Sequence, residues 1–410
     1  MEQSPHAANI PKARLDLDFM PIEHQGRQMV LVQDRLGLVA QGTALPVWVY
    51  HLLTILDGTR VTRDIQHQLS RLRQGGQVSP QEVGQLLDEL DSLHLLDTPG
   101  YRQTRQELIN AFSRSPVRPA VLSGRSYPEA RDDLSGLLDG ILASKTGTVS
   151  QPSNRSVGLV APHIDLDIGR RTYGTAYSAI QGQRFDRIVV LGIGHQLTDG
   201  CYSLTSKTFT TPLGQLAADA QAVTMLREHG SGCLSPDDFA HRDEHSAEFQ
   251  VLFLQHLLGR EKPILVPILC GSLLGSLPEY SREAFLDMTG EFLDALRALI
   301  TEPDKSTLIV AGVDLSHIGP KFGHDLEAAG LETQAVAHDT ELLERLVAGD
   351  APGFWQESKR HHDRFNVCGF SALATMLEIL PPCTGRILDY QMWHEAPTRS
   401  AVSFAAAVFD

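Results

Sequence analysis

Short apolar runs alternate with longer amphipathic segments from Val157 to the end of the chain. The apolar runs are Val157–Ala161, Ile188–Leu191, Ile264–Leu269, Leu308–Val313, Ile387–Tyr390 and Val402–Val408. Apolar residues recur at helical spacing in Gly174–Gln181, Ala217–Glu228, Ser246–Leu258, Tyr280–Leu299, Leu326–Leu346 and Gly369–Leu380. Apolar runs of this length are typical of buried strands. Their alternation with helices predicts an α/β domain over residues 157–410, with a mixed central sheet flanked by helices.

The first part of the chain has a different pattern. Residues 16–32 alternate between apolar and polar positions around Gly26, which predicts a hairpin. Helical patterns follow at Pro46–Leu56, at Thr62–Arg73 and after Ser79, where Glu82 completes a capping-box spacing. A hairpin with three short helices predicts a small α+β, winged-helix-like domain over residues 1–115. Residues 116–156 are then a connection, with a helix around Tyr127–Ser144 and a linker over Lys145–Ser156.

Polar side chains stand where the apolar runs of the second domain end. His163 follows the first run, His195 the second, and Asp314 and His317 the fourth. Ligand sites of α/β sheets lie outside the carboxyl ends of the strands. We therefore expect these side chains to meet in one crevice, where His317 beside Asp314 has the spacing for proton transfer. An Asp-capped turn is the alternative at Asp314.

Cys368 precedes a helical run that begins at Gly369, so its thiol is expected near a helix N-terminus that favours the thiolate. Two imidazoles and a thiolate are ligands suited to a divalent transition metal.

The segment Asp243–Glu248 opens an apolar helix and allows two interpretations. It is either an ordinary helix start capped by Ser246, or it brings Glu244 and His245 into the same crevice. The sequence favours neither.

The composition of the chain argues against several classes of protein. Hydrophobic residues make up 42% of the 410 positions and the net charge is −15, which indicates a globular protein and argues against binding to nucleic acid or an anionic membrane. Five cysteines without paired spacing do not form a disulfide framework, and no uncharged apolar stretch is long enough to span a membrane. We expect a cytoplasmic protein.

As an ordered set, the motifs of residues 157–410 resemble the MEMO family. They are Ala161-Pro162-His163, Gly194-His195, Thr211-Pro212-Leu213, Asp243-Glu244-His245-Ser246, Val266-Pro267-Ile268-Leu269, Asp314-Leu315-Ser316-His317, Cys368-Gly369 and Ser400-Ala401-Val402-Ser403-Phe404-Ala405. The resemblance implies the fold of class III extradiol dioxygenase catalytic subunits. It also implies a role as protein B of the AmmeMemoRadiSam system, with a radical SAM enzyme and a second small protein as partners.

By the same resemblance, His163, His195 and Cys368 fall on metal-binding positions, and His317 falls on an acid/base histidine. Asp314 and His245 match neighbouring pocket positions. The implied metal is Fe²⁺, with Zn²⁺, Cu or Mn²⁺ as alternatives. Cysteine replaces the dioxygenase carboxylate, which weakens the oxygenase inference because a thiolate is itself oxidisable.

The sequence also departs from the family pattern after the first histidine. Many members continue with Ala-Gly-Tyr, whereas this chain has Ile164-Asp165-Leu166. Asp165 is thus expected to hydrogen-bond a ligand imidazole, as Glu244 could also do.

The N-terminal pattern consists of Met29-Val30-Leu31-Val32-Gln33-Asp34, then a helix ending at Ile55-Leu56 and the turn Asp57-Gly58-Thr59. It resembles the small domains that present precursor peptides to peptide-modifying enzymes, a group typified by the pyrroloquinoline quinone chaperone. The acidic residues Asp57, Asp64, Asp88, Glu89 and Asp91 make a peptide or protein a better partner than DNA.

Three functions follow from these observations. The first is a metal-binding, redox-related protein that acts with a radical SAM system. The second is an extradiol-type dioxygenase acting on a small aromatic or peptide-borne group. The third is a non-enzymatic scaffold or metal carrier that recruits a peptide or protein.

Overall fold

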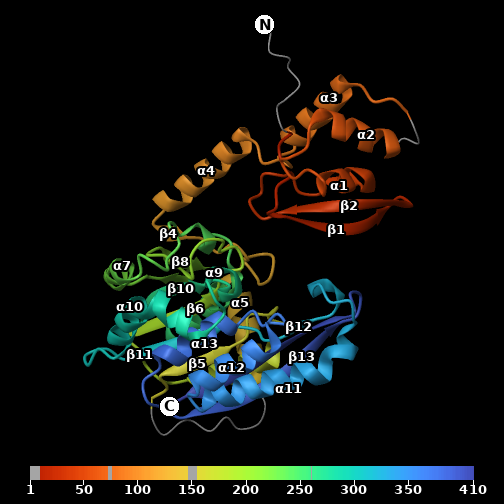
Figure 1. The fold of residues 1–410 in the computed structure, drawn as a ribbon. Helices are drawn as coiled ribbons and strands as arrows, with labels where there is room; N and C mark the ends of the chain where they lie inside the picture. The colour runs from red at the N-terminus through yellow and green to blue at the C-terminus, as the bar shows by residue number, and fades with distance from the viewer. Residues whose placement is uncertain (1–9, 73–75, 146–154, 260) are drawn as a thin grey trace. The chain divides into compact units, whose positions relative to one another are not determined.

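The computed structural model describes residues 10–72, 76–145, 155–259 and 261–410 (Figure 1). The chain divides into two structural units, Met1–Phe112 and Ser113–Asp410. Most of the predicted linker Lys145–Ser156 lies outside the described residues.

The first unit contains the predicted hairpin and helices. Strands β1 (Leu17–His24), β2 (Arg27–Asp34) and β3 (Ala44–Pro46) form an antiparallel sheet in that order. The helices are α1 (Val47–Leu53), α2 (Thr62–Leu72) and α3 (Pro80–Ser92), followed by α4 (Pro99–Arg114), which the pattern did not predict. Ser79 and Glu82 form the expected capping box. Helix α1 ends at Leu53 rather than Leu56. The amides of Ile55 and Leu56 donate to the carbonyls three residues earlier, those of Leu52 and Leu53, which is the hydrogen-bond pattern of a 3₁₀ turn.

A mixed sheet forms the centre of the second unit, in the order β12-β14-β5-β11-β6-β10-β7, with β13 paired to β14. Its parallel strands are β5 (Gly158–Ala161), β11 (Thr307–Gly312), β6 (Arg187–Ile193) and β10 (Ile264–Cys270). The antiparallel strands are β7 (Tyr202–Leu204), β12 (His317–Ile318), β13 (Gly385–Glu395) and β14 (Ser400–Phe409). A separate small sheet joins β4 (Val117–Arg118), β8 (Thr208–Thr211) and β9 (Gly214–Leu216).

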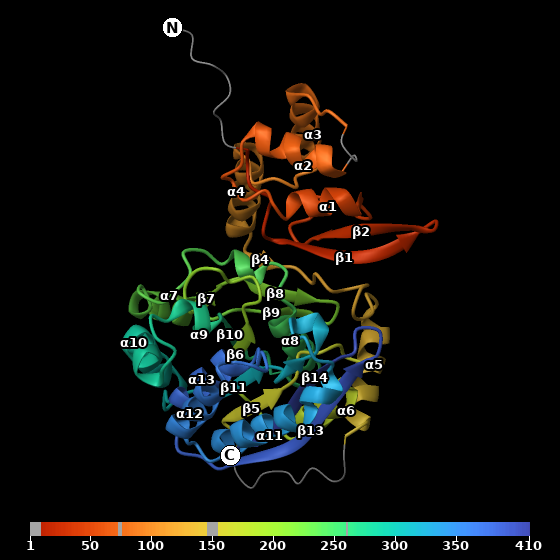
Figure 2. The same cartoon turned by 45° about the vertical axis from the view of Figure 1, so that its right-hand side comes forward.

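Successive residues of the central strands enter two hydrophobic cores, one on each face of the sheet. In β6, Val189 and Leu191 pack into one core, whereas Ile188 and Val190 pack into the other. Helices α7 (Ala220–His229), α10 (Arg282–Ile300), α11 (Ala328–Val347), α12 (Ala351–His361) and α13 (Phe370–Ile379) contribute to the first core. Helices α5 (Arg131–Ala143), α6 (Arg170–Ser178) and α8 (His245–Leu258) contribute to the second (Figure 2). Burial on both faces explains why these strands are continuous apolar runs.

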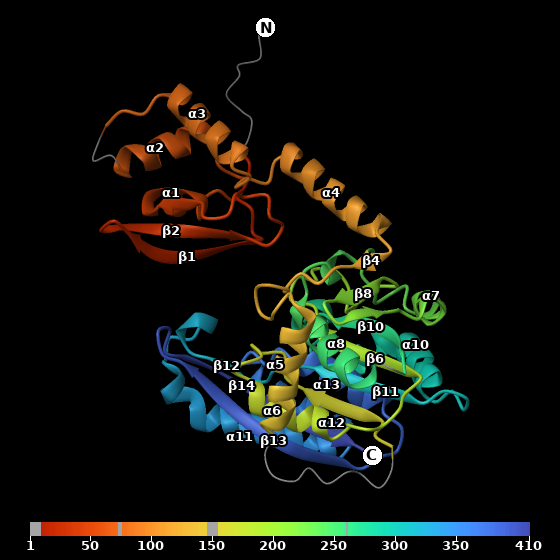
Figure 3. The ribbon, with the colours of Figure 1, turned by 180° about the vertical axis from the view of Figure 1, so that it is seen from behind.

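The predicted α/β class is therefore confirmed, although several short elements were missed. Helix α12, the four-residue helix α9 (Leu273–Ser276), the turns η1 (Phe239–His241) and η2 (Pro320–Phe322), and strands β4, β7, β8, β9 and β12 were not predicted. Strand β13 is longer than the run Ile387–Tyr390, because its polar residues pair with β14 at half-buried positions (Figure 3). No helix within the described ranges is apolar and long enough to cross a membrane.

Candidate metal centre

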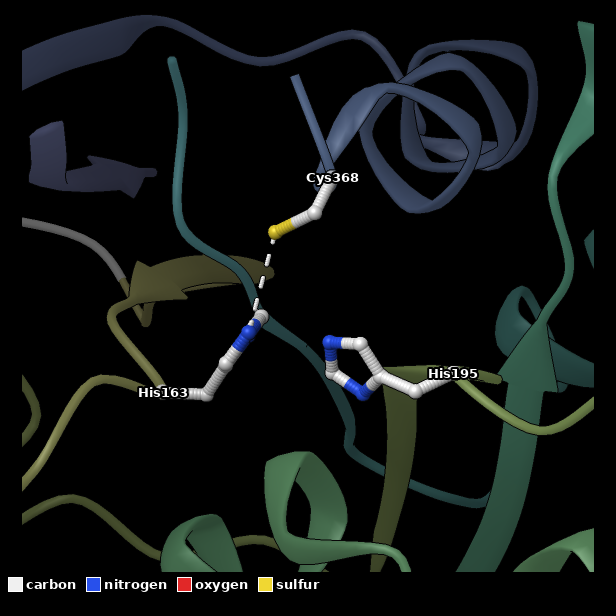
Figure 4. Close-up of side chains that lie close together, drawn as sticks. All are labelled: His163, His195 and Cys368. Atoms are coloured by element: carbon white, nitrogen blue, oxygen red, sulfur yellow. Dashed lines mark hydrogen bonds between the residues drawn. The ribbon is translucent and has the colours of Figure 1, made fainter. Parts of the chain in front are cut away.

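The carboxyl ends of three neighbouring strands assemble the site. Strand β11 lies between β5 and β6 and pairs in parallel with both. His163 follows β5, His195 follows β6, and Asp314 follows β11. Cys368 enters from the loop between α12 and α13. The structure thus brings together residues far apart in the sequence (Figure 4).

His163 is held in a single tautomer. Its Nδ1 lies 3.0 Å from the carbonyl oxygen of Gly312, which can only accept, so Nδ1 carries the proton. The backbone amide of His163 donates to Oδ1 of Asp314 at 3.0 Å. Burial, and then the neighbouring His195, lowers the pKa of His163 to about 3, so the ring is neutral. Its Nε2 therefore offers a lone pair, 3.7 Å from Sγ of Cys368.

Glu244 fixes His195 in the same way. The carboxylate accepts from the backbone amide of His195 at 3.2 Å and from its ring Nδ1 at 3.1 Å, so Nδ1 carries the proton and the lone pair of the ring is on Nε2. Burial alone would raise the pKa of Glu244, but His195, His245 and the amide of Ser246 outweigh it and hold the pKa well below its ordinary value. A charged carboxylate behind a ligand imidazole orients the ring and increases its basicity.

Cys368 completes a group of three ligand atoms. Its Sγ lies 3.5 Å from the carbonyl oxygen of Asp314, and the ligand atoms of His163, His195 and Cys368 lie within 4.8 Å of one another. Metal–nitrogen bonds of about 2.0–2.1 Å and metal–sulfur bonds of about 2.3 Å place N and S roughly 3.6 Å apart in a tetrahedron. The 3.7 Å between Nε2 of His163 and Sγ fits that edge.

The expected thiolate at Cys368 is not what this environment favours. Burial, followed by the charges of Asp314 and Glu244, raises the pKa of the thiol well above its ordinary value. The sequence showed the nearby helix but not the depth of burial, and burial is the larger effect. A metal ion would have to displace the thiol proton.

The helix start at residues 243–248 combines both interpretations. Helix α8 begins at His245, and Glu244 is its N-cap, accepting from the amide of Ser246 at 2.9 Å. Ser246 is not the cap; its Oγ instead accepts from the amide of Ile193. His245 faces the centre, since its ring stacks on His195 at 4.9 Å and meets His163 edge-on at 5.2 Å. Burial lowers its pKa to about 4, so it is a neutral base beside the ligands.

Asp314 and His317 both lie near the centre, but each side chain is hydrogen-bonded to the backbone and not to the other. Oδ1 of Asp314 accepts from the amides of His163 and Ile164, while Nδ1 of His317 lies 2.9 Å from the carbonyl oxygen of Leu315. The backbone carbonyl of Leu315 therefore holds a proton on Nδ1 of His317. Burial raises the pKa of Asp314 and lowers that of His317, and each charge partly opposes the shift of the other.

Asp165 does not occupy the expected place behind a ligand imidazole. Its side chain is exposed, and Oδ1 accepts from the amides of Asp167 and Ile168 in the turn before α6. Aspartate side chains often accept a hydrogen bond from the backbone amide two residues later, and the carboxylate of Asp165 is used in such a turn. The orienting carboxylate is Glu244.

Sequence reasoning missed two supports of the centre. Gln250 donates from Nε2 to the carbonyl of Pro162 at 2.9 Å, directly before His163, and accepts from the hydroxyl of Tyr177 at 2.6 Å. Arg118 donates to the backbone carbonyl of Glu244 at 2.7 Å and pairs with the buried Glu248. The available signal was a pair of polar residues, Glu248 and Gln250, within the otherwise apolar stretch 247–254 of the helix.

A cavity of about 280 Å³ opens beside the centre, with His195 and Cys368 in its wall. Apolar side chains form much of the remaining lining, including Leu197, Leu273 and Phe370. Asp363, Asn366 and Ser371 add polar groups. A small molecule with an apolar body and one or two polar groups would fit this lining.

Comparison with known proteins yields one family. The family model described as "Memo-like protein" matches residues 118–408. A "MEMO1 family protein" of Aquifex aeolicus is 29% identical over 97% of this chain and 99% of its own length. A relative from Thermus thermophilus is 26% identical over 85% of this chain and 99% of its own length. A relative from Nitrosopumilus maritimus is 24% identical over 72% of this chain and 99% of its own length.

Proposed function

The chain belongs to the Memo-like protein family, and on that premise we propose that it is a metal-dependent protein of redox chemistry. Its centre would hold Fe²⁺ on His163, His195 and Cys368. One observation carries the proposal: acceptors hold the Nδ1 protons of both histidines, so each ring has its lone pair on Nε2, and the ligand atoms of the two histidines and the thiol lie within 4.8 Å of one another.

The donor set supports a transition metal over a hard cation. Two neutral imidazoles and one thiolate suit Fe²⁺, Zn²⁺ or copper better than Mn²⁺. The metal would supply Lewis acidity and, if it is iron or copper, one-electron chemistry. His245 and His317, both held neutral by burial, are placed to accept a proton from a bound molecule.

Metal analysis tests the centre. The full chain, loaded with Fe²⁺ without oxygen and then desalted, is expected to retain one equivalent at this centre. His163→Ala and Cys368→Ser should each lose it, whereas Cys383→Ser, which alters a half-buried thiol outside the group, should retain it. Unchanged iron in both centre variants would remove the proposal.

A second candidate is oxygenation of a small aromatic or peptide-borne group by an extradiol-type reaction. The apolar cavity beside His195 and Cys368 favours it. Oxygen uptake by the Fe²⁺-loaded protein with a panel of catechols tests this function. Absence of turnover with every member would reject it without affecting the metal centre.

We further propose that the first unit recruits the radical SAM enzyme and the second small protein. The outer face of its sheet carries the cross-strand pairs Met20–Leu31 and Ile22–Met29, and Met20 is 45% exposed. Met20→Glu, on β1, should reduce co-purification of these partners with the full chain, whereas Gln85→Glu, at an exposed position of α3, should not. Equal recovery from both variants would exclude this face, and capture of a precursor peptide alone would favour a peptide role.

A further inference from the structure

We propose that a second divalent metal site, suited to zinc, lies between helices α11 and α12. Its ligands are His338 of α11 with Glu357 and His361 of α12. The site goes beyond the proposed function, because none of these residues belongs to the centre formed by His163, His195 and Cys368.

The three side chains converge on one point. Nδ1 of His338 lies 3.0 Å from Oε1 of Glu357, and Nε2 of His361 lies 3.2 Å from the same oxygen. The ligand atoms all lie within 4.8 Å of one another. Zinc bonds of about 2.0–2.1 Å separate two ligand atoms by roughly 3.3 Å in a tetrahedron. Both nitrogen–oxygen distances are close to that value.

Helical spacing explains the convergence. Glu357 and His361 are four residues apart, so their side chains share one face of α12. His338 meets that face from α11, and its ring lies 4.7 Å from the ring of His361. His361 is 28% exposed, which gives its ring room to rotate and leaves an open position for water. Two histidines, one glutamate and a water form a zinc ligand set known from enzymes.

Charge also favours a cation here. Glu357 is 6% exposed, and a buried carboxylate needs compensation for its lost hydration. Arg360 contacts Oε2 at 2.9 Å, but its own side chain is 67% exposed, so solvent screens that pair. The other oxygen, Oε1, faces two imidazole nitrogens. A divalent ion at this point would neutralise the carboxylate and bind both nitrogens.

An ion here would join two helices that border the first centre. Phe365 packs against both histidines at 5.3 Å, and its carbonyl accepts from the amide of His317 at 2.7 Å. Asp339, next to His338, accepts from the hydroxyl of Ser316 at 2.7 Å. The second site is therefore connected to the segments that carry His317 and Cys368, and its ion would order them.

Zinc binding by the full chain in which the first centre is removed tests the site. The variant H163A/C368S, stripped of metal and titrated with Zn²⁺ by calorimetry, should bind a single equivalent. Adding Glu357→Gln or His361→Ala should abolish that equivalent. Adding His362→Ala should not, because this exposed neighbour is outside the cluster.

Thermal unfolding provides the second measurement. Zinc should raise the Tm of H163A/C368S and of its His362→Ala derivative, but not of the derivatives lacking Glu357 or His361. Circular dichroism before titration shows whether each variant is folded. Absence of stoichiometric zinc in H163A/C368S, or an equal Tm shift in the His361→Ala derivative, would overturn the proposal. Either result is independent of iron at the first centre, which these variants lack.

Discussion

Glu244 holds His195 at two points, because its carboxylate accepts from both the backbone amide and the ring Nδ1 of that histidine. The position of the ring and its tautomer are thus set by one side chain. Glu244 also caps α8 through the amide of Ser246, so the helix and the ligand are fixed together.

Glu244→Gln should therefore weaken metal binding while leaving the protein folded. The amide that replaces one carboxylate oxygen cannot accept a hydrogen bond, and the negative charge is lost. Loss of such a support lowers metal affinity by about 10–100-fold. Competition with a chelator measures the change. Asp165→Asn, which alters an exposed carboxylate, is the control, and an equal affinity for both variants would contradict the orienting role.

Metal affinity should rise with pH. The pKa of Cys368 lies well above its ordinary value, so the thiol is protonated in the neutral range and must release a proton when the metal binds. The pKa of His163 is about 3, so that ring has no proton to release near pH 7. Apparent affinity should then increase about tenfold per pH unit from pH 6 to 8. Calorimetry in buffers of different ionisation enthalpy measures the released proton, and binding without proton release at pH 7 would contradict a protonated thiol.

Arg118→Met should strongly destabilise the second unit. The guanidinium pairs with Glu248 in a fully buried site and donates to the carbonyls of His241 and Glu244. Its removal leaves a buried carboxylate without its cation, which costs about 3–5 kcal/mol of the free energy of unfolding. Urea denaturation measures the loss. The double variant R118M/E248Q should recover part of it, and a loss below about 1 kcal/mol in the single variant would refute the role of the pair.

Gly369→Ala should lower both stability and metal affinity. An added Cβ would lie 2.5 Å from the carbonyl oxygen of Asp314 and 2.7 Å from Cβ of Val313, so the backbone next to Cys368 would have to move. Overpacking of this kind costs about 1–3 kcal/mol. Gly290→Ala is the matched control, because nothing lies within 4 Å of that position in α10, and it should stabilise the helix by about 1 kcal/mol. Equal effects would exclude crowding as the cause.

The ligand positions could be predicted because buried parallel strands are unbroken apolar runs. A polar residue directly after such a run, as with His163 and His195, marks the edge of the sheet. The tautomers could not be predicted in this way. The groups that hold His163 and His317 are the backbone carbonyls of Gly312 and Leu315. Every residue has such a carbonyl, so the amino-acid sequence does not show which of them will face a histidine.

The errors at Asp165 and Cys368 have a common cause. Asp165 is close to His163 in sequence, but its carboxylate accepts a hydrogen bond from the nearby amide of Asp167 instead of a ligand imidazole. Cys368 precedes a helix, but its burial dominates its acidity. In both cases a local pattern was visible and the three-dimensional environment was not. The cluster of His338, Glu357 and His361 escaped notice for the same reason, since α12 itself was not predicted.

Strand β11 separates β5 from β6, so it acts as a spacer between the two histidine ligands. Neighbouring strands lie about 4.8 Å apart, which sets the backbones that lead to His163 and His195 roughly 10 Å from each other. Hydrogen bonds on both sides of β11 prevent this gap from stretching or closing. The repeat distance of the sheet therefore sets the separation of the two backbones from which the imidazoles reach a shared ion.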